Sequence, residues 1–234
     1  MKLVILTTDT PHHKYYVWKM CNEFLVTAIF LERLALKPKF DTSHLFEQVR
    51  GDFEQTTLMS GGPKTFNEVA ETLIFDNVND RESLYKLNEI KPDIIVDVGT
   101  GKLLTEVINI PLKACLNLHG GNPENYRGLD SHLWAIYNND YADLITTLHF
   151  VEEELDTGNI IYKTKLQIPK GCKLFQLRSI NTRACVDLSV KALSSVANGE
   201  KLPSTKQSKR GKYYSFMPAE LKGRCVLDFE QHFA

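Results

Sequence analysis

The sequence lacks long apolar runs and the short motifs that mark metal or redox sites. No apolar stretch approaches the ~20 residues that a membrane-spanning helix needs. The five cysteines are odd in number and form no Cys-x-x-Cys pair, which is typical of reduced thiols in the cytoplasm. No His-Glu-x-x-His motif occurs, and the seven histidines are scattered. We therefore expect a cytoplasmic protein that does not cross a membrane and holds no metal.

An excess of charge of either sign is also missing. Lys and Arg number 28, Asp and Glu number 29, and the net charge is −1 with neutral histidines. This balance argues against a nucleic-acid-binding surface and against attraction to an anionic membrane. The basic run 206–212 (KQSKRGK) is local and is more typical of a solvated turn. We expect small-molecule partners and no nucleic acid.

What the sequence does contain is an alternation of apolar strand patterns with amphipathic helix patterns. The N-terminal run LVILTT reads as a buried strand rather than a signal peptide. Strands are predicted at 3–8, 25–32, 72–78, 93–99, 112–118, 143–151 and 158–168. Helices are predicted at 12–24, 81–90, 130–139 and 172–199, the last with a break near 179–182 left open. Residues 211–217 are predicted to form a strand or hairpin arm.

Such alternation favours parallel strand pairing with helices on both faces of the sheet. The predicted fold class is α/β: a Rossmann-like, mostly parallel twisted sheet, followed by a long helix and a short C-terminal hairpin or tail. We place the catalytic domain at 1–200 and a short C-terminal extension at 201–234. In sheets of this kind, ligands bind at the carboxyl ends of the strands.

The stretch CLNLHGGNPENYRG places Asn117 and His119 at such a strand end. The period of two along a strand puts both side chains on one face. Asp156 follows in the turn before the next strand but one. An amide can donate to a developing oxyanion, an imidazole can move a proton, and a carboxylate can orient that imidazole. These groups suit acyl or formyl transfer to an amine, although Asn, His and Gly also occur in ordinary turns.

The absence of two further motifs limits the types of reaction that the sequence supports. No Gly-x-Ser-x-Gly motif occurs and no cysteine lies where a nucleophile would, so direct attack by the amine is preferred to a covalent enzyme intermediate. No Gly-x-Gly-x-x-Gly fingerprint follows the first strand, which makes a dehydrogenase the weakest alternative. Hydrolysis of the formyl donor by water, and a non-catalytic nucleotide-sugar binding module, remain as alternatives.

Residues 93–168 resemble the formyltransferases that use N10-formyltetrahydrofolate. The resemblance rests on LNLHGGNPENYRGLDSHLWAIYNND and HFVEEELDTGNII, in which the family pattern is matched in order by Asn117, His119, Pro123, Arg127, Gly128, Trp134, Asp156 and Gly158. It implies that N10-formyltetrahydrofolate is the co-substrate. The loop reads Gly-Gly-Asn-Pro where many members have Ser-Leu-Leu-Pro, which puts the pterin or acceptor contact in doubt. The residues after about 170 are too few for the barrel domain of tRNA-directed members, so a tRNA acceptor is not expected.

The segments YRGLDSHLWAIY and GKYYSFMPAEL look more similar to the short bacterial nucleotide-sugar N-formyltransferases. This similarity implies an acceptor such as dTDP-4-amino-4,6-dideoxyglucose, on a route to the O-antigen of lipopolysaccharide or another surface polysaccharide. The implied roles are His119 as general base, Asn117 as donor to the formyl oxygen, and Asp156 as the group that holds His119 or a water and relays a proton.

Two sets of binding residues are expected around these three. The folate set lies along the strand end at 98–99 and the loop 120–128 and comprises Val98, Gly99, Gly120, Gly121, Asn122, Pro123, Arg127 and Asp156. Arg127 can alternatively hold the loop through backbone carbonyls. The acceptor set comprises Thr10, His12, His13, Lys14, Asp130, Tyr213 and Tyr214. The two tyrosines can instead pack against a second subunit, so a homodimer is left open.

Overall fold

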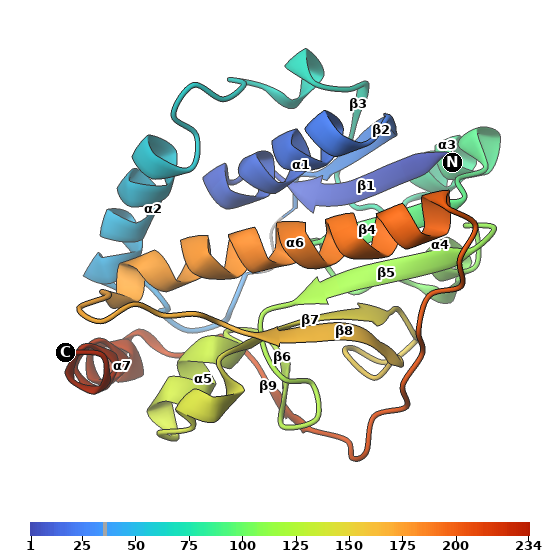
Figure 1. Cartoon of the computed structure of the whole chain (residues 1–234). Coiled ribbons are helices and arrows are strands. Elements are labelled where there is room, and N and C mark those ends of the chain that lie inside the picture. The colour runs from blue at the N-terminus through green and yellow to red at the C-terminus, as the bar shows by residue number, and fades with distance from the viewer. Residues whose placement is uncertain (35–36) are drawn as a thin grey trace.

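A twisted sheet of seven strands forms the centre of the molecule (Figure 1). The structure, a computed structural model, describes residues 1–34 and 37–234. The strand order is β3-β2-β1-β4-β5-β7-β8. The strands are β1 (Leu3–Thr8), β2 (Val26–Glu32), β3 (Thr72–Phe75), β4 (Ile94–Val98), β5 (Ala114–His119), β7 (Ile145–Phe150) and β8 (Ile160–Lys165). The first five pair in parallel, and β7 and β8 are antiparallel to their neighbours.

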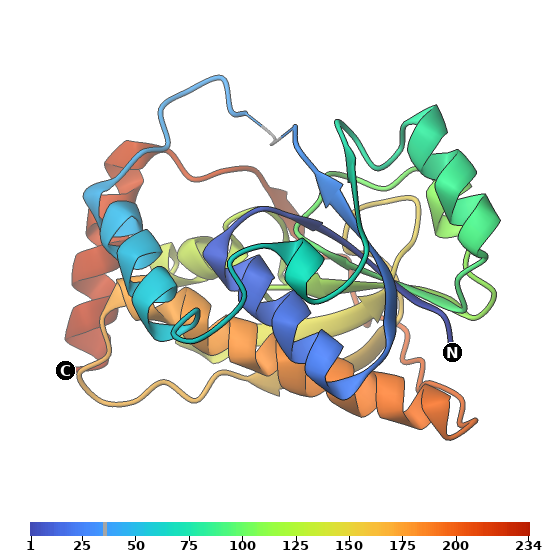
Figure 2. The same cartoon turned by 90° about the horizontal axis from the view of Figure 1, so that it is seen from above.

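Helices cover both faces of this sheet, which explains why its central strands are largely buried and mostly apolar. Every residue of β4 is buried, as are all but the last of β1. Helices α1 (Pro11–Glu23) and α6 (Leu177–Ala197) lie side by side across one face (Figures 1 and 2). Helices α3 (Arg81–Ile90) and α4 (Thr105–Ile108) cover the other.

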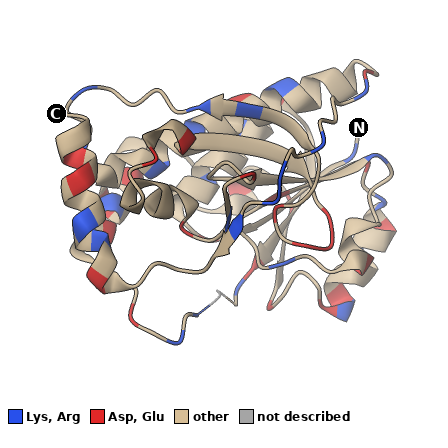
Figure 3. Cartoon of the chain, turned by 90° about the horizontal axis from the view of Figure 1, so that it is seen from below, with Lys and Arg blue, Asp and Glu red and all other residues tan. Residues whose placement is uncertain are grey.

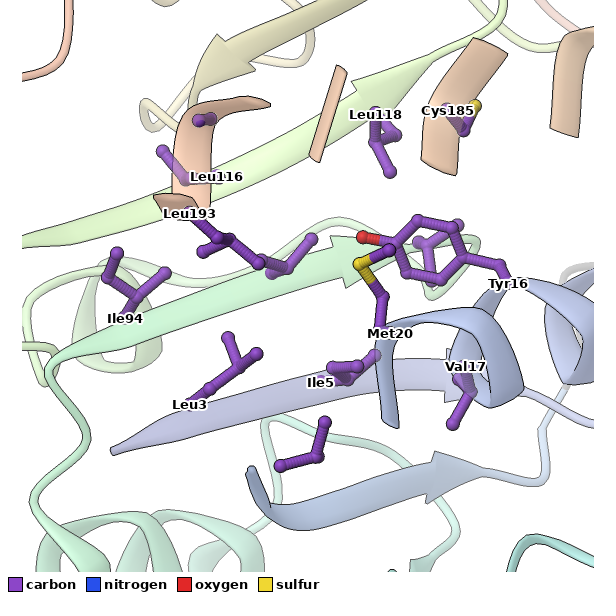
Figure 4. Close-up of a cluster of buried hydrophobic side chains, with 14 of the residues drawn as sticks. Leu3, Ile5, Tyr16, Val17, Met20, Ile94, Leu116, Leu118, Cys185 and Leu193 are labelled. Atoms are coloured by element: carbon purple, nitrogen blue, oxygen red, sulfur yellow. The ribbon is translucent and has the colours of Figure 1, made fainter. Parts of the chain in front are cut away.

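The core between the sheet and the α1–α6 pair joins segments that are far apart in the sequence. Figure 4 shows Tyr16 and Met20 of α1 packed against side chains of β1, β5 and α6. The buried Tyr16 hydroxyl donates to Ser189 Oγ on α6 at 2.8 Å, so the one polar atom of that side chain is satisfied within the apolar layer.

A second apolar cluster lies beyond the sheet and supports the loops that follow β5. It is built around helices α5 (Ser131–Tyr137) and α7 (Ala219–His232), with Phe229 of α7 fully buried. The remaining elements are α2 (Leu45–Thr57), β6 (Tyr126–Gly128), β9 (Lys212–Tyr214) and the 3-10 turns η1 (Phe66–Glu68), η2 (Tyr141–Asp143) and η3 (Leu174–Gln176).

The predicted α/β fold, with a mostly parallel sheet and a long helix near the C-terminus, is confirmed. Of the two alternatives for residues 211–217, the strand is observed as β9; the hairpin is not, because β9 pairs in parallel with β6 and α7 follows it. The break near 179–182, which the sequence analysis leaves open, does not occur. The helical backbone is continuous over 177–197, although the Thr182 hydroxyl bonds the Arg178 carbonyl at 2.7 Å, a bond that often bends helices. The division into domains at residue 200 stays a prediction.

Two surface features bear on the expected partners. Figure 3 shows Lys and Arg interspersed with Asp and Glu along α7 and the peripheral loops, not gathered by sign. Within residues 1–34 and 37–234, none of the helices combines the length and apolarity that crossing a bilayer would take.

Candidate active site

A cavity of about 620 Å³ opens where β4 and β5 end. Its walls come from the loop after β4, the loop after β5, the turn between β7 and β8, and the sides of α1, α2 and α6. This is the edge at which parallel sheets bind ligands. Asn117, His119 and Asp156 all line it.

Strand register sets three polar side chains in a row along the cavity wall. Asp97 of β4 is the cross-strand partner of Asn117, and Asn117 is in turn the partner of His149 on β7. All three point away from the α1–α6 layer, because their neighbours Val96, Leu116 and Leu148 alternate into that core. The row is therefore a direct consequence of which strands pair.

Asp156 reaches this row from the turn between β7 and β8. Its backbone adopts φ = +56°, an uncommon conformation for a residue other than glycine. Its Oδ2 accepts the backbone N–H of Gly128 at 2.7 Å. Around its Oδ1 lie Asn117 Nδ2 at 3.4 Å, His119 Nδ1 at 3.5 Å and His149 Nε2 at 3.4 Å. One carboxylate oxygen is thus the meeting point of three side chains.

Backbone carbonyls determine which nitrogen of each imidazole carries its hydrogen. His119 Nε2 lies 2.8 Å from the Tyr126 carbonyl oxygen, and His149 Nδ1 lies 2.7 Å from that of Phe150. A carbonyl can only accept, so each of these nitrogens donates. His119 Nδ1 is consequently the nitrogen that faces Asp156. Neutral His149 accepts the Asn117 amide N–H at Nε2, 3.1 Å away.

Asp156 is ionised at neutral pH despite its burial. Burial by itself raises the pKa of this carboxyl, but His119, His149 and the Gly128 N–H outweigh it and hold the pKa well below its ordinary value. The negative charge of Asp156 is therefore fixed beside two imidazoles.

The structure brings together the three residues predicted to be catalytic and adds a fourth, His149, which the sequence analysis missed. His149 lies in the middle of a strand pattern, and its antiparallel pairing with Asn117 has no local signature. The period of two along a strand would have placed His149 on the same face as Thr147. It would not have shown that the neighbouring strand is β5, with Asn117 opposite His149.

Of the residues expected to bind folate, Gly99, Gly120 and Asp156 line the cavity, and Val98, Gly121, Asn122, Pro123 and Arg127 do not. Arg127 Nε instead donates to the Leu155 carbonyl at 3.0 Å, and Asn122 Nδ2 donates to Asp143 at 3.0 Å. A Cβ on Gly121 would come within 2.8 Å of His119 Nε2, so this glycine lets the loop approach the imidazole.

Of the residues expected to bind the acceptor, His12, His13, Asp130 and Tyr213 line the cavity, and Thr10, Lys14 and Tyr214 do not. Burial, then the Arg178 charge, lowers the pKa of His13 to about 3, so it offers no positive charge to a phosphate. Thr10 is the N-cap of α1, Lys14 Nζ donates to the Lys64 carbonyl at 3.2 Å, and Tyr214 stacks on Tyr126 and Trp134.

Charged residues that the sequence analysis did not single out form the end of the cavity nearest α2 and α6. Arg178 binds both carboxylate oxygens of the fully buried Glu54, at 2.6 and 2.5 Å. Arg50 lies beside them and bonds Glu47 at 3.1 Å. The pair Glu54–Arg178 joins α2 to α6 and has no signal in the sequence, because 124 positions separate its members.

The segment after α6 buttresses the turn that carries Asp156. Gln207 Nε2 donates to the carbonyl oxygens of Asp156 and Gly158, at 2.8 and 2.9 Å. Thr205 bridges to Ile160 of β8, and Lys212 N–H donates to the Asn125 carbonyl at 3.1 Å. Residues 205–214 thus contact both loops that meet at Asp156. As to metals, the part of the chain that the structure describes contains no group of three His, Cys, Asp or Glu side chains able to hold an ion.

The sequence matches a known protein family and several known proteins. The family described as formyl transferase matches residues 55–180. A methionyl-tRNA formyltransferase of Clostridium acetobutylicum is 33% identical over 174 residues, which cover 70% of this chain and 56% of that protein. The chain thus matches little more than half the length of this relative.

Solved structures share the fold at low identity. A 4-N formyltransferase from Francisella tularensis superposes with a TM-score of 0.60 at 18% identity, covering 92% of this chain and 76% of the other. A formyltransferase from Anoxybacillus kamchatkensis, solved with UDP-4,6-dideoxy-4-formamido-L-AltNAc and tetrahydrofolate, gives 0.54 at 17% identity, covering 91% and 85%. The family match spans more than half of the chain and includes the strand end, the loop and the turn that form the site. This chain belongs to the formyl transferase family.

Proposed function

We propose that this protein transfers a formyl group from N10-formyltetrahydrofolate to the amino group of a nucleotide-linked amino sugar. The observation that carries the proposal is the convergence of Asn117, His119 and Asp156 at the wall of one open cavity. The co-substrate supplies an activated formyl group. The protein has to bind two reactants, stabilise an oxyanion and move one proton.

Each of the three side chains has an atom free for one of these tasks. His119 Nδ1 is the proposed base that takes the proton from the attacking nitrogen, since Nε2 is committed to the Tyr126 carbonyl. Asn117 has one amide N–H held by His149 and a second with only a 3.4 Å contact to Asp156, so the second can turn to the oxygen that gains charge.

Asp156 is the proposed orienting group for His119 or a water. Its lowered pKa means that it does not itself bring a proton at neutral pH, so the proton delivered to the leaving nitrogen is the one that His119 has taken up. The carboxylate stabilises the imidazolium in between. In this proposal the His119 imidazole carries the proton between the two nitrogens, and the negative charge of Asp156 stabilises the imidazolium that forms.

The identity of the acceptor as a nucleotide-linked amino sugar has separate support. Its support is that two proteins of similar fold are described as a 4-N formyltransferase and as a formyltransferase solved with a UDP-linked formamido sugar. The curated relatives, by contrast, are methionyl-tRNA formyltransferases. For the sugar, dTDP-4-amino-4,6-dideoxyglucose is the first candidate to try, with O-antigen synthesis as its context.

The test is to incubate the protein with N10-formyltetrahydrofolate and, separately, a panel of dTDP- and UDP-linked amino sugars or methionyl-tRNA. We expect one nucleotide sugar to gain the mass of a formyl group with release of tetrahydrofolate. Formylation of methionyl-tRNA alone would overturn the acceptor, and formate release without any acceptor would favour hydrolysis. If a folded sample of the protein formylates none of these acceptors and releases no formate, the proposed function is wrong.

Gln207 offers a test of how the Asp156 turn is held. Gln207→Glu keeps the shape of the side chain but replaces its N–H donors with oxygen, which repels the two carbonyls it now bonds. We expect kcat to fall by about 10–100-fold with KM changed little, because misplacing a catalytic group by ~1 Å has effects of this size. Ser204→Ala removes an exposed bond to Asn159 on the same segment and should leave kcat unchanged. If Gln207→Glu and Ser204→Ala both keep the kcat of the unaltered protein, the turn that carries Asp156 does not depend on Gln207 for its position.

A further inference from the structure

Asp97 is a carboxyl in the cavity wall to which neither the sequence analysis nor the proposed mechanism gives a role. It lies at the C-terminal end of β4, is 7% exposed and lines the cavity. Its strand register places it next to Asn117, on the side opposite His149. The α-carbons of neighbouring strands are about 5 Å apart, so a group bound at Asn117 lies within reach of Asp97.

Among the residues that the structure describes, one of the two oxygens of Asp97 has hydrogen-bond partners and the other has none. Oδ1 accepts the Thr100 hydroxyl at 2.7 Å and the Thr100 backbone N–H at 3.4 Å, which closes the turn after β4. Among the described residues, no protein group donates to Oδ2. That oxygen is also not one of the enclosed polar atoms without a partner, so it retains access to the cavity.

Within residues 1–34 and 37–234, the groups that act on Asp97 include other acids, and no Lys, Arg or His forms an ion pair with it. Burial raises the pKa of this carboxyl to about 7, with Glu32 and Asp156 adding to the rise and the two Thr100 bonds opposing it. Glu32, at the end of β2, already accepts hydrogen bonds with both of its carboxylate oxygens. The donors are the backbone N–H groups of Gly101 and Val78, at 2.9 and 3.0 Å. Cys115 is buried on the same side of β5 and Asn117 is uncharged.

A purely structural role accounts for Oδ1 and leaves Oδ2 unexplained. Closing the 97–100 turn needs one acceptor oxygen, which an asparagine supplies equally well. Oδ2 has access to the cavity and no donor among the described residues, so it is the atom of this carboxyl that is free to accept from a bound reactant. The open oxygen therefore points to a bound N–H group.

We propose that Asp97 Oδ2 accepts a hydrogen bond from a nitrogen-bearing group of a reactant and so determines which amine or amino-heterocycle the cavity binds. The inference rests on the proposed function for the identity of the two reactants. The N–H group has two possible sources, which are the amine of the acceptor and the 2-amino group of the pteridine ring of the donor. The experiment separates them.

The decisive variant is Asp97→Asn, which keeps an oxygen for Thr100 and replaces Oδ2 with a donor. KM is measured for each reactant in turn, and the dissociation constants of tetrahydrofolate and of the amino sugar are measured by calorimetry without turnover. We expect the dissociation constant and KM of one reactant to rise about 10–100-fold, which is the effect of losing a hydrogen bond to a charged group. The kcat should stay within about threefold of the value for the unaltered protein. The reactant affected identifies the source.

The pH dependence gives a second readout. The ionised form of Asp97 is the better acceptor, so binding of the affected reactant should tighten as the pH rises from 6 to 8 more steeply in the unaltered protein than in Asp97→Asn. Thr100→Val removes the hydroxyl bonds to Asp97 Oδ1 and to the Gly101 carbonyl, so it should lower the melting temperature and move this pH dependence to higher pH without abolishing it. If Asp97→Asn fails to fold, Asp97→Ser takes its place.

Unchanged constants for both reactants in Asp97→Asn would overturn the proposal, and so would a loss confined to kcat. Neither result would touch the proposed function, which is judged by formyl transfer in the unaltered protein. If that protein binds both reactants but transfers no formyl group, the proposed function fails while calorimetry still decides the role of Asp97.

Discussion

Asp156→Asn is expected to lower kcat by about 10²–10⁴-fold while the protein stays folded. The substitution removes the charge that stabilises the imidazolium formed when His119 Nδ1 takes up a proton, and it places an N–H group among three side chains that now face an acceptor. The Gly128 N–H can keep its oxygen partner, so the loop position is retained. His119→Ala and Asn117→Ala should each cost a similar factor.

The measurement is kcat for formyl transfer at saturating donor and acceptor, with circular dichroism to show that each variant is folded. Glu153→Gln is the matched control, because it makes the same chemical change three positions away on an exposed side chain and should leave kcat unaltered. Near-normal turnover in Asp156→Asn would remove this carboxylate from the mechanism and with it the reason for the convergent geometry.

Gly158→Ala should have the largest effect on stability of any single methyl group added to the site. A Cβ at this position would lie 1.8 Å from the carbonyl oxygen of Phe150, which is backbone and cannot rotate away. We expect the free energy of unfolding to fall by about 3 kcal/mol or more, at the upper end of what overpacking costs. Because Gln207 bonds the Gly158 carbonyl, the turn that carries Asp156 should shift as well.

Gly51→Ala is the opposite control for this experiment. Gly51 lies inside α2, and a Cβ there has no atom within 4 Å, so the added methyl should raise the free energy of unfolding by up to about 1 kcal/mol through helix propensity. Urea denaturation of both variants gives the two values. A Gly158→Ala protein as stable as the unaltered one would mean that the turn between β7 and β8 has room to move.

Local patterns were sufficient to predict most of the fold. The mostly apolar run at 93–99 predicted a strand, and every residue of β4, which spans 94–98, is buried. The acidic first turn and amphipathic spacing at 81–90 predicted α3 with its observed bounds. Spacing by two residues put Asn117 and His119 on one face of β5, and both line the cavity. Missed were β6 and α7. β6 has three residues and is held by its pairing with β9. In α7 the spacing of four between Leu221, Cys225 and Phe229 is a helical pattern that could have predicted it.

The sequence by itself determined the strand and helix alternation, the strand end at which the site lies, and the Asn117–His119 pair, because periodicity and turn chemistry are properties of neighbouring residues. Only the tertiary structure decided that His149 and Asp97 flank Asn117, that Gln207 supports Asp156, and that Arg178 pairs with Glu54. These contacts depend on which strands pair, in what register and direction, and on which helices pack together. Those choices are made by the burial of the whole chain at once, so no single segment records them.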